Sequence, residues 1–180
     1  MEQSLTNSIM ADPKTVFSGS CACGDITFTT TTLPLSVNFC NCVTCRKLSG
    51  SPFLPFADFE PSAVHIKSPS GTVDATTLQP DHAHFHTFKL SDVAIRGACK
   101  RCHSPLTMIY LKPHPHLAIT LGSIDESSID TDDKHHSLST YTHIFGSQRV
   151  TWYDITKDSV KIDPRFPDSF SADIDDKLKQ

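Results

Sequence analysis

The sequence predicts an all-β fold that forms one domain from short strands. Long runs of Ala, Leu, Glu and Lys with a period of about 3.6 residues, which long amphipathic helices require, are missing from the chain. The apolar runs are instead short, and most are bounded by Gly, Pro, Ser or Asp, as is typical of β-domains. A chain of 180 residues, 38% of them hydrophobic, is long enough to build one compact core.

The first strand is predicted over residues 25–32. Ile26 and Phe28 share one face there, and a run of threonines favours extended backbone. Pro34 is expected to end this strand. Further strands, each short and flanked by turn residues, are predicted over residues 36–39, 63–67, 84–90, 93–96, 107–111, 117–121 and 139–144.

The remaining segments are predicted to be a helical turn, a loop and two polar ends. Residues 44–48 follow a cysteine group and are expected to form one helical turn, while residues 68–80 are predicted to be an exposed loop. Residues 1–16 are expected to be a flexible N-terminal segment, and residues 167–180 a polar C-terminal tail rich in Asp and Lys. The domain itself is therefore predicted over residues 17–166.

Charge and hydropathy exclude several classes of protein. A formal net charge of -4 and a pI near 6.2 lack the basic footprint of a nucleic-acid-binding domain, so no nucleic-acid partner is predicted. No run of about 18 or more apolar residues is present, which excludes a membrane-spanning helix. The first 20 residues contain no apolar block of the kind that a signal peptide needs. We therefore expect a cytoplasmic protein that has no membrane partner.

The seven cysteines of the chain fall into three groups. The groups are Cys21 with Cys23, then Cys40, Cys42 and Cys45, and finally Cys99 with Cys102. In a reducing compartment, an odd number of cysteines at such short spacings is better explained by metal thiolates than by disulfides. The spacing therefore predicts metal sites, and we expect two zinc ions per chain.

The first and last groups are predicted to share one closed site. A C-x-x-C turn such as that of Cys99 and Cys102 places its sulfurs about 3.5 to 4 Å apart, as tetrahedral zinc with Zn–S bonds near 2.3 Å requires. Cys21 and Cys23 need a bent backbone, because a regular strand would separate them by about 6.5 Å, and Gly24 permits that bend. Four thiolates would complete the tetrahedron, and such closed sites are usually structural.

The middle group has three thiolates and no fourth cysteine. One position on its metal would go to water, a histidine or a substrate, and three protein ligands with an exchangeable fourth is the arrangement of catalytic zinc. Three thiolates leave zinc with a net negative charge, which Arg46 and Lys47 beside Cys45 are expected to offset. Two alternatives stay open. The group consists of ordinary buried thiols, or His103 or another histidine closes a purely structural site.

The cysteine groups and their surroundings resemble the glutathione-dependent formaldehyde-activating enzyme (GFA) family, which includes the centromere protein V-like β-tent zinc proteins. The family's G-x-C-x-C-G start is similar to GSCACGDI at residues 19–26, and its C-x-C-x-x-C-[RQ]-K-x-x-G signature is similar to CNCVTCRKLSG at residues 40–50. Its C-x-x-C-G-[ST]-x-[LI] element resembles CKRCHSPL at residues 99–106. Later segments that resemble the family are residues 121–125, 143–145 and 152–155.

The resemblance implies a single-domain β-tent of short antiparallel strands around two zinc sites. It assigns a structural zinc to Cys21, Cys23, Cys99 and Cys102, and the second zinc to Cys40, Cys42 and Cys45. The chain departs from the family pattern at Asn41, where His is common, and at His103, where Gly is common.

The activity that the resemblance implies is carbon–sulfur lyase chemistry. In the family this is the reversible joining of formaldehyde and glutathione to S-(hydroxymethyl)glutathione, and a related small molecule is the other substrate class expected for this chain. Two alternatives remain. The scaffold is redirected to another elimination, addition or cyclisation, or it is a non-catalytic zinc scaffold that binds a protein partner. The oligomeric state does not follow from the sequence.

Other candidate residues can be explained without a metal ion. The alternating histidines of residues 82–86 would share one face of a strand, but their spacing is too wide for one ion. His143 is expected to be a satisfied core histidine rather than an acid–base catalyst. Trp152 and Tyr153 are expected either to line a pocket or to pack in the core.

Overall fold

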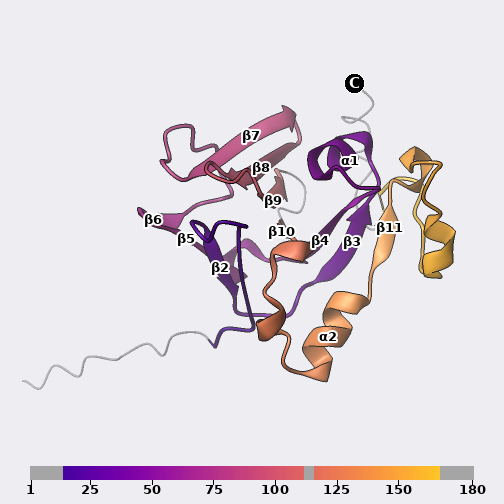
Figure 1. The fold of residues 1–180 in the computed structure, drawn as a ribbon, viewed down its shortest axis with the longest axis horizontal. Coiled ribbons are helices and arrows are strands. Elements are labelled where there is room, and N and C mark those ends of the chain that lie inside the picture. Colours follow the sequence, from indigo (N-terminus) through magenta and orange to yellow (C-terminus); the bar gives the residue numbers. More distant parts are fainter. Residues whose placement is uncertain (1–13, 112–115, 167–180) are drawn as a thin grey trace, which may run out of the picture.

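Within residues 14–111 and 116–166, which the computed structural model describes, the chain forms two β-sheets and two short α-helices (Figure 1). The smaller sheet has the strand order β1-β2-β5-β6 and comprises β1 (Phe17–Ser20), β2 (Thr27–Thr30), β5 (Val64–Ser68) and β6 (Gly71–Val73). The larger sheet has the order β11-β3-β4-β10-β9-β8-β7 and comprises β3 (Ser36–Cys40), β4 (Leu54–Phe59), β7 (Phe85–Ser91), β8 (Ala94–Cys99), β9 (Pro105–Tyr110), β10 (Leu117–Thr120) and β11 (Thr142–Ile144). The helices are α1 (Val43–Ser49) and α2 (Asp132–Ser139).

The fold predicted as all-β is mostly β, with two α-helices beside the sheets, and its predicted antiparallel topology needs one correction. Among the described strands every pair is antiparallel except β3 and β11, which run parallel with Phe39 opposite His143. Parallel neighbours need a long crossover connection. The chain supplies one here, because it passes through both sheets and α2 before β11 joins the edge of the larger sheet. The strands are therefore mixed rather than all antiparallel.

The predicted elements lie at the observed positions, but several of their bounds differ from those in the structure. Each predicted strand overlaps an observed one, and the helical turn over residues 44–48 is α1. The strand predicted over residues 139–144 is wrong at its start, since α2 ends at Ser139 and β11 begins at Thr142. The loop predicted over residues 68–80 contains β6, while β1, β4 and α2 were not among the predicted elements. The two predicted ends lie outside the described residues, apart from residues 14–16.

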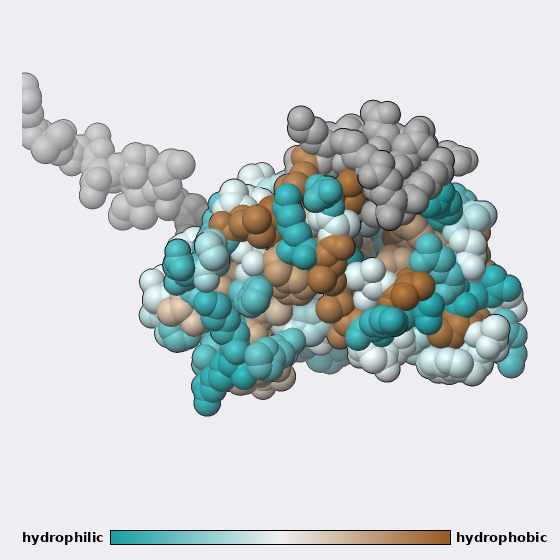
Figure 2. Space-filling model, turned by 90° about the horizontal axis from the view of Figure 1, so that it is seen from above, coloured by the Kyte–Doolittle hydropathy of each residue, from teal (hydrophilic) through white to brown (hydrophobic). Residues whose placement is uncertain are grey.

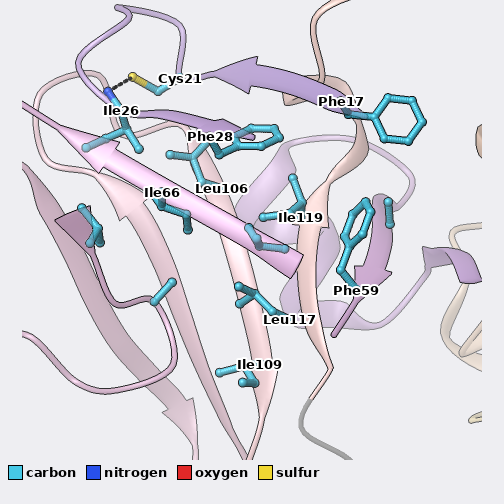
Figure 3. Close-up of a cluster of buried hydrophobic side chains, with 14 of the residues drawn as sticks. Phe17, Cys21, Ile26, Phe28, Phe59, Ile66, Leu106, Ile109, Leu117 and Ile119 are labelled. Atoms are coloured by element: carbon cyan, nitrogen blue, oxygen red, sulfur yellow. Dashed lines mark hydrogen bonds between the residues drawn. The ribbon is translucent and has the colours of Figure 1, made fainter. Parts of the chain in front are cut away.

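The main hydrophobic core joins side chains of both sheets (Figure 3). Phe17 and Phe28 come from the smaller sheet, and Phe59, Leu106 and Ile119 come from the larger one. All five side chains are buried. One face of each sheet is thereby removed from water, which is the main source of stability in a fold of this kind.

The opposite face of the larger sheet carries a second buried cluster. Successive side chains of a strand point to opposite faces. In β10, Leu117 and Ile119 belong to the main core, while Ala118 between them belongs to the second cluster. In β3, Val37 belongs to the main core and Cys40 to the second cluster. The middle cysteine group therefore lies on the face that the smaller sheet does not cover.

In the view of Figure 2, several hydrophobic side chains lie close together near the middle, with hydrophilic ones around them. Trp152, which was expected to line a pocket or to pack in the core, is not a core residue, because it is 71% exposed. Tyr153 makes an edge contact with Phe53, at 5.7 Å between ring centroids. None of the described helices has the length and apolarity that a transmembrane segment needs.

Candidate metal centres

Cys21, Cys23, Cys99 and Cys102 bring their sulfurs together in one group, the four-sulfur cluster. All four sulfurs lie within 4.8 Å of one another. The Sγ atoms of Cys21 and Cys23 are 3.6 Å apart, and those of Cys23 and Cys99 are 3.8 Å apart. Tetrahedral zinc with four thiolates separates its sulfurs by about 3.8 Å. The cluster thus has the dimensions of a four-thiolate metal site.

Two tight turns give the four-sulfur cluster its shape. Gly24 adopts φ +78°, and its N–H donates to the carbonyl oxygen of Cys21 at 3.0 Å, so the strand bends as predicted. The second turn places His103 at φ +61°, where its N–H donates to the carbonyl oxygen of Cys99 at 3.0 Å. Glycine adopts this backbone region at the least cost, which explains why it is common at that position of the family pattern.

The four-sulfur cluster also connects the two sheets. Cys21 directly follows β1 of the smaller sheet, and Cys99 is the last residue of β8 in the larger sheet. Cys21 and Cys99 are buried, whereas Cys23 and Cys102 are half-buried. A metal held here would cross-link two sheets that otherwise meet through side-chain packing. That position is appropriate for a structural site.

Cys40, Cys42 and Cys45 form a second group, the three-sulfur cluster, on the other face of the larger sheet. Their sulfurs also lie within 4.8 Å of one another. Cys40 ends β3, while Cys42 is the N-cap of α1 and its sulfur accepts from the N–H of Cys45 at 3.4 Å. Gly50, at φ +66°, ends the helix after two turns. The short helix thus curls Cys45 back toward the other two sulfurs.

The three sulfurs do not titrate alike. Hydrogen bonds from Cys40 and then from Cys45 lower the pKa of Cys42 to about 3. Hydrogen bonds with Cys42 and Cys45, together with burial, hold the pKa of Cys40 well above its usual range. A hydrogen bond with Cys40 lowers the pKa of Cys45, but the bond with Cys42 and burial outweigh it and raise the pKa to about 11. The metal-free cluster therefore carries one thiolate at neutral pH.

The cation that contacts the three-sulfur cluster is Arg96, from β8. Its Nη2 lies 3.6 Å from the sulfur of Cys45. The sequence suggested Arg46 and Lys47 for this role, but Nε of Arg46 donates to the carbonyl oxygen of Asn41 at 3.1 Å, and Lys47 is exposed. The sequence did not indicate Arg96 for this role, because β8 and α1 are distant in the chain and come together only in the folded protein. The guanidinium offsets part of the negative charge that three thiolates place there.

Asn41 fixes the loop between Cys40 and Cys42. Its side chain is fully buried, and Nδ2 donates to the carbonyl oxygens of Phe39 at 3.0 Å and Ile144 at 2.9 Å. The same nitrogen lies 3.2 Å from Nδ1 of His143, whose Nε2 lies 2.8 Å from Oδ2 of Asp158. The two hydrogens of Nδ2 face three acceptors, so one is shared, and a hydrogen bond to Nδ1 leaves Nε2 with the proton that Asp158 accepts. His143 is thus a buried histidine with both ring nitrogens paired.

Replacing Asn41 by Asp is expected to lower the free energy of unfolding by about 3 kcal/mol, because a buried carboxylate cannot donate to the acceptors that surround Nδ2. Urea denaturation measures the change. Gln148→Glu is the matched control, since the amide oxygen of Gln148 accepts from the N–H of Val43 at 3.1 Å and a carboxylate keeps that acceptor. The control should stay within about 0.5 kcal/mol of the parent. Equal effects in the two variants would contradict this account.

Two cavities border the three-sulfur cluster. One of about 330 Å³ is lined by Cys40, and the other of about 190 Å³ is lined by Cys42 and Arg96. Tyr110 lies in the walls of both. Each cavity thus has one cysteine of the cluster in its wall. The four-sulfur cluster, by comparison, already has four sulfurs around its centre.

No histidine closes the three-sulfur cluster within residues 14–111 and 116–166. His103, which the sequence left as one possibility, follows Cys102 at the other cluster. None of the histidines of residues 82–86 belongs to either sulfur cluster. The rings of His82 and His84 lie 6.5 Å apart, and Nδ1 of His84 is 3.7 Å from a carboxylate oxygen of Asp25. The described residues thus offer the three-sulfur cluster no fourth protein ligand of these types.

One comparison with known proteins agrees with the cysteine pattern. The family described as "Glutathione-dependent formaldehyde-activating enzyme" matches residues 16–148. Among solved structures, the crystal structure of a Rhodobacter sphaeroides protein is similar at 12% sequence identity and a TM-score of 0.46, covering 63% of this chain and 95% of that chain. No curated protein matches the chain.

Proposed function

Because the chain belongs to the glutathione-dependent formaldehyde-activating enzyme family, we propose that it is a zinc-dependent carbon–sulfur lyase-type enzyme. Its substrate would be the glutathione–formaldehyde adduct S-(hydroxymethyl)glutathione or a related small molecule. The observation that carries this proposal is the three-sulfur cluster, which has cavities on two sides and no fourth ligand from the described histidines, cysteines or carboxylates. An exchangeable position on a metal is where a substrate thiolate or oxygen binds.

The residues present fit zinc in both clusters. Thiolate sulfur is a soft ligand that suits zinc. Two sulfur separations in the four-sulfur cluster, 3.6 and 3.8 Å, agree with tetrahedral zinc, and the sulfurs of the three-sulfur cluster lie within 4.8 Å of one another. We propose that Cys21, Cys23, Cys99 and Cys102 hold a structural zinc, and that Cys40, Cys42 and Cys45 hold a second zinc within a β-tent domain over residues 17–166. Seven reduced cysteines also favour a cytoplasmic site of action.

When bound, zinc at the three-sulfur cluster would supply a Lewis acid that holds a substrate thiolate or polarises a hydroxymethyl oxygen. In the forward reaction the thiol sulfur forms a bond to the carbon of formaldehyde, while the carbonyl oxygen takes up the proton that the thiol releases.

The residues around the cluster contribute positioning and charge. Asn41 and His143 fix the cysteine loop, and Arg96 places a cation beside Cys45. The cation favours an anionic sulfur or oxygen in the adjacent cavity.

Exchange NMR with ¹³C-formaldehyde and glutathione tests this proposal. We expect the zinc-loaded protein to accelerate exchange between free formaldehyde and the adduct, and we expect Cys42→Ala to abolish the acceleration. Metal analysis should find two zinc ions in the parent and one in the variant. Exchange at the spontaneous rate in a parent that holds two zinc ions would refute the glutathione reaction. It would favour the redirected scaffold or the protein-binding scaffold.

A further inference from the structure

The larger cavity follows β3 away from the three-sulfur cluster. Ser36, Asn38 and Cys40 alternate along this strand and all line the cavity. Ser36 and Cys40 are four steps apart along the strand, which corresponds to about 13 Å. Between these ends the walls are largely apolar, with Phe56, Met108, Ala118 and Ile144 among the lining residues. The cavity is thus elongated, and the three-sulfur cluster lies at one end of β3.

Asp163 presents a buried carboxylate to the same cavity. The residue is 8% exposed, and its Oδ1 lies 2.8 Å from Nζ of Lys161. Its Oδ2 is buried and has no hydrogen-bond partner among the residues that the structure describes. An unsatisfied buried oxygen of an ionisable group is costly, and in a native structure it indicates an additional partner such as a ligand or water. Since Asp163 lines the cavity, that partner would lie inside it.

The backbone register places Asp163 near the three-sulfur end of the cavity. Its N–H donates to the carbonyl oxygen of His143 at 2.8 Å, and its own carbonyl oxygen accepts from the N–H of Gly146 at 2.9 Å. Asp163 therefore lies beside Ile144, whose neighbour on β3 is Cys40. Two strand spacings separate Asp163 from Cys40, which is about 10 Å. A molecule of that length can contact both residues.

The other charged groups of the cavity do not reverse its preference for a hydrogen-bond donor. Asp58 adds a second carboxylate, whose Oδ2 accepts from Ser36 at 2.8 Å and from Asn38 at 2.6 Å. The side chain of Lys161 is 63% exposed, so most of it faces solvent. His116 also lines the cavity, and its Nε2 lies 3.8 Å from a carboxylate oxygen of Glu60, a residue that does not line it. Among the lining residues, Asp163 is the one with a buried side-chain oxygen that has no partner in the described residues.

We propose that this cavity binds a small molecule with an apolar middle and an amine at one end, the amine donating to Oδ2 of Asp163 while the other end reaches the metal position at Cys40. This inference rests on the proposed function and specifies its substrate class. An aminothiol, or the formaldehyde adduct of one, has this chemistry. Glutathione fits the cavity less well, because its carboxylates would face Asp58 and Asp163.

Three probes with the same six-carbon chain separate the effect of the charged group from the effect of the thiol that binds the metal. These are 6-amino-1-hexanethiol, 6-mercaptohexanoate and hexylamine, each titrated calorimetrically into the zinc-loaded protein. We expect the aminothiol to bind at least about tenfold more tightly than the mercapto acid, because a charge-assisted hydrogen bond replaces a repulsion between carboxylates. Asp163→Asn should reduce this ratio to about twofold or less. Lys161→Met, which keeps the carboxylate of Asp163, should preserve the ratio.

The outcomes distinguish this inference from the proposed function. Equal affinity for both thiols in the parent protein, or a preference that survives Asp163→Asn, would overturn the amine site and leave the metal chemistry intact. Binding of hexylamine that depends on Asp163, with no additional affinity from the thiol group, would support the amine site and count against the reactive metal position. If Asp163→Asn does not fold, the comparison of hexylamine with hexanoate in the parent decides, since a site for anions would bind hexanoate better.

Discussion

Replacing Cys99 by Ser is expected to unfold the domain. Cys99 is fully buried, and its sulfur lies 3.8 Å from that of Cys23 across the junction of the two sheets. Under the proposed function this cluster holds a structural zinc, whose binding contributes roughly 10 kcal/mol or more to folding. A domain of this size is stable by only roughly 5–15 kcal/mol in total. Loss of one ligand therefore removes stabilisation comparable to the whole, and we expect no cooperative melting transition by circular dichroism.

Cys42→Ser is the matched control for that experiment, because it removes one sulfur from the other cluster. The three-sulfur cluster lies on the face of the larger sheet that the smaller sheet does not cover, so a metal held there would not connect the sheets. We expect this control to keep a cooperative transition and to lose one zinc ion. If Cys99→Ser melted cooperatively within a few degrees of the parent, the four-sulfur cluster would not be the structural centre of the domain.

The sequence signals for strands were strong where apolar residues alternated and weak where they did not. β4 (Leu54–Phe59) was missed although it lies between β3 and β10, because Pro55 argues against a central strand. The register explains the exception. β10 pairs with β4 only from Phe56 to Phe59, so Pro55 lies just beyond β10, and its missing N–H breaks no bond to that strand.

Helix α2 was missed for a different reason. Only Leu138 is buried in it, so it has no apolar period that the sequence could reveal. Its start is nevertheless marked, since Thr131 caps it by accepting from the N–H of Lys134 at 3.4 Å, and Asp132 and Asp133 occupy its first turn. The two acidic residues are therefore an N-terminal helix signal.

The cysteine groups could be predicted from spacing because the ligand set of a metal site is short-range and chemically narrow. The surroundings of the three-sulfur cluster could not. Arg96 lies 51 residues from Cys45 in the sequence, and Asp163 approaches the cavity only through its pairing beside β11. Such neighbours depend on which strands become adjacent. The sequence therefore predicts the metal-binding chemistry more completely than the substrate pocket.

Zinc binding to the three-sulfur cluster is expected to weaken about 100-fold for each pH unit lost between pH 8 and pH 6, because binding releases about two protons. The pKa of Cys42 is about 3, so this residue is already a thiolate in the metal-free protein. Cys45, with a pKa of about 11, and Cys40, whose pKa lies well above its usual range, must each lose a proton to become ligands. Protons compete with zinc at both sulfurs, so lower pH reduces the affinity.

Calorimetric titration of zinc in buffers of different ionisation enthalpy counts the released protons, and Cys42→Ser separates the two clusters. Release of three protons at pH 7 would show that Cys42 is protonated without metal, contrary to the hydrogen bonds that Cys40 and Cys45 donate to it.

Arg96→Met sharpens the test, since Arg96 lowers the pKa of both Cys42 and Cys45 by its charge. Removing it raises the energy of every thiolate in the cluster, so zinc affinity at pH 7 should fall while the melting temperature, which depends on the four-sulfur cluster, changes little.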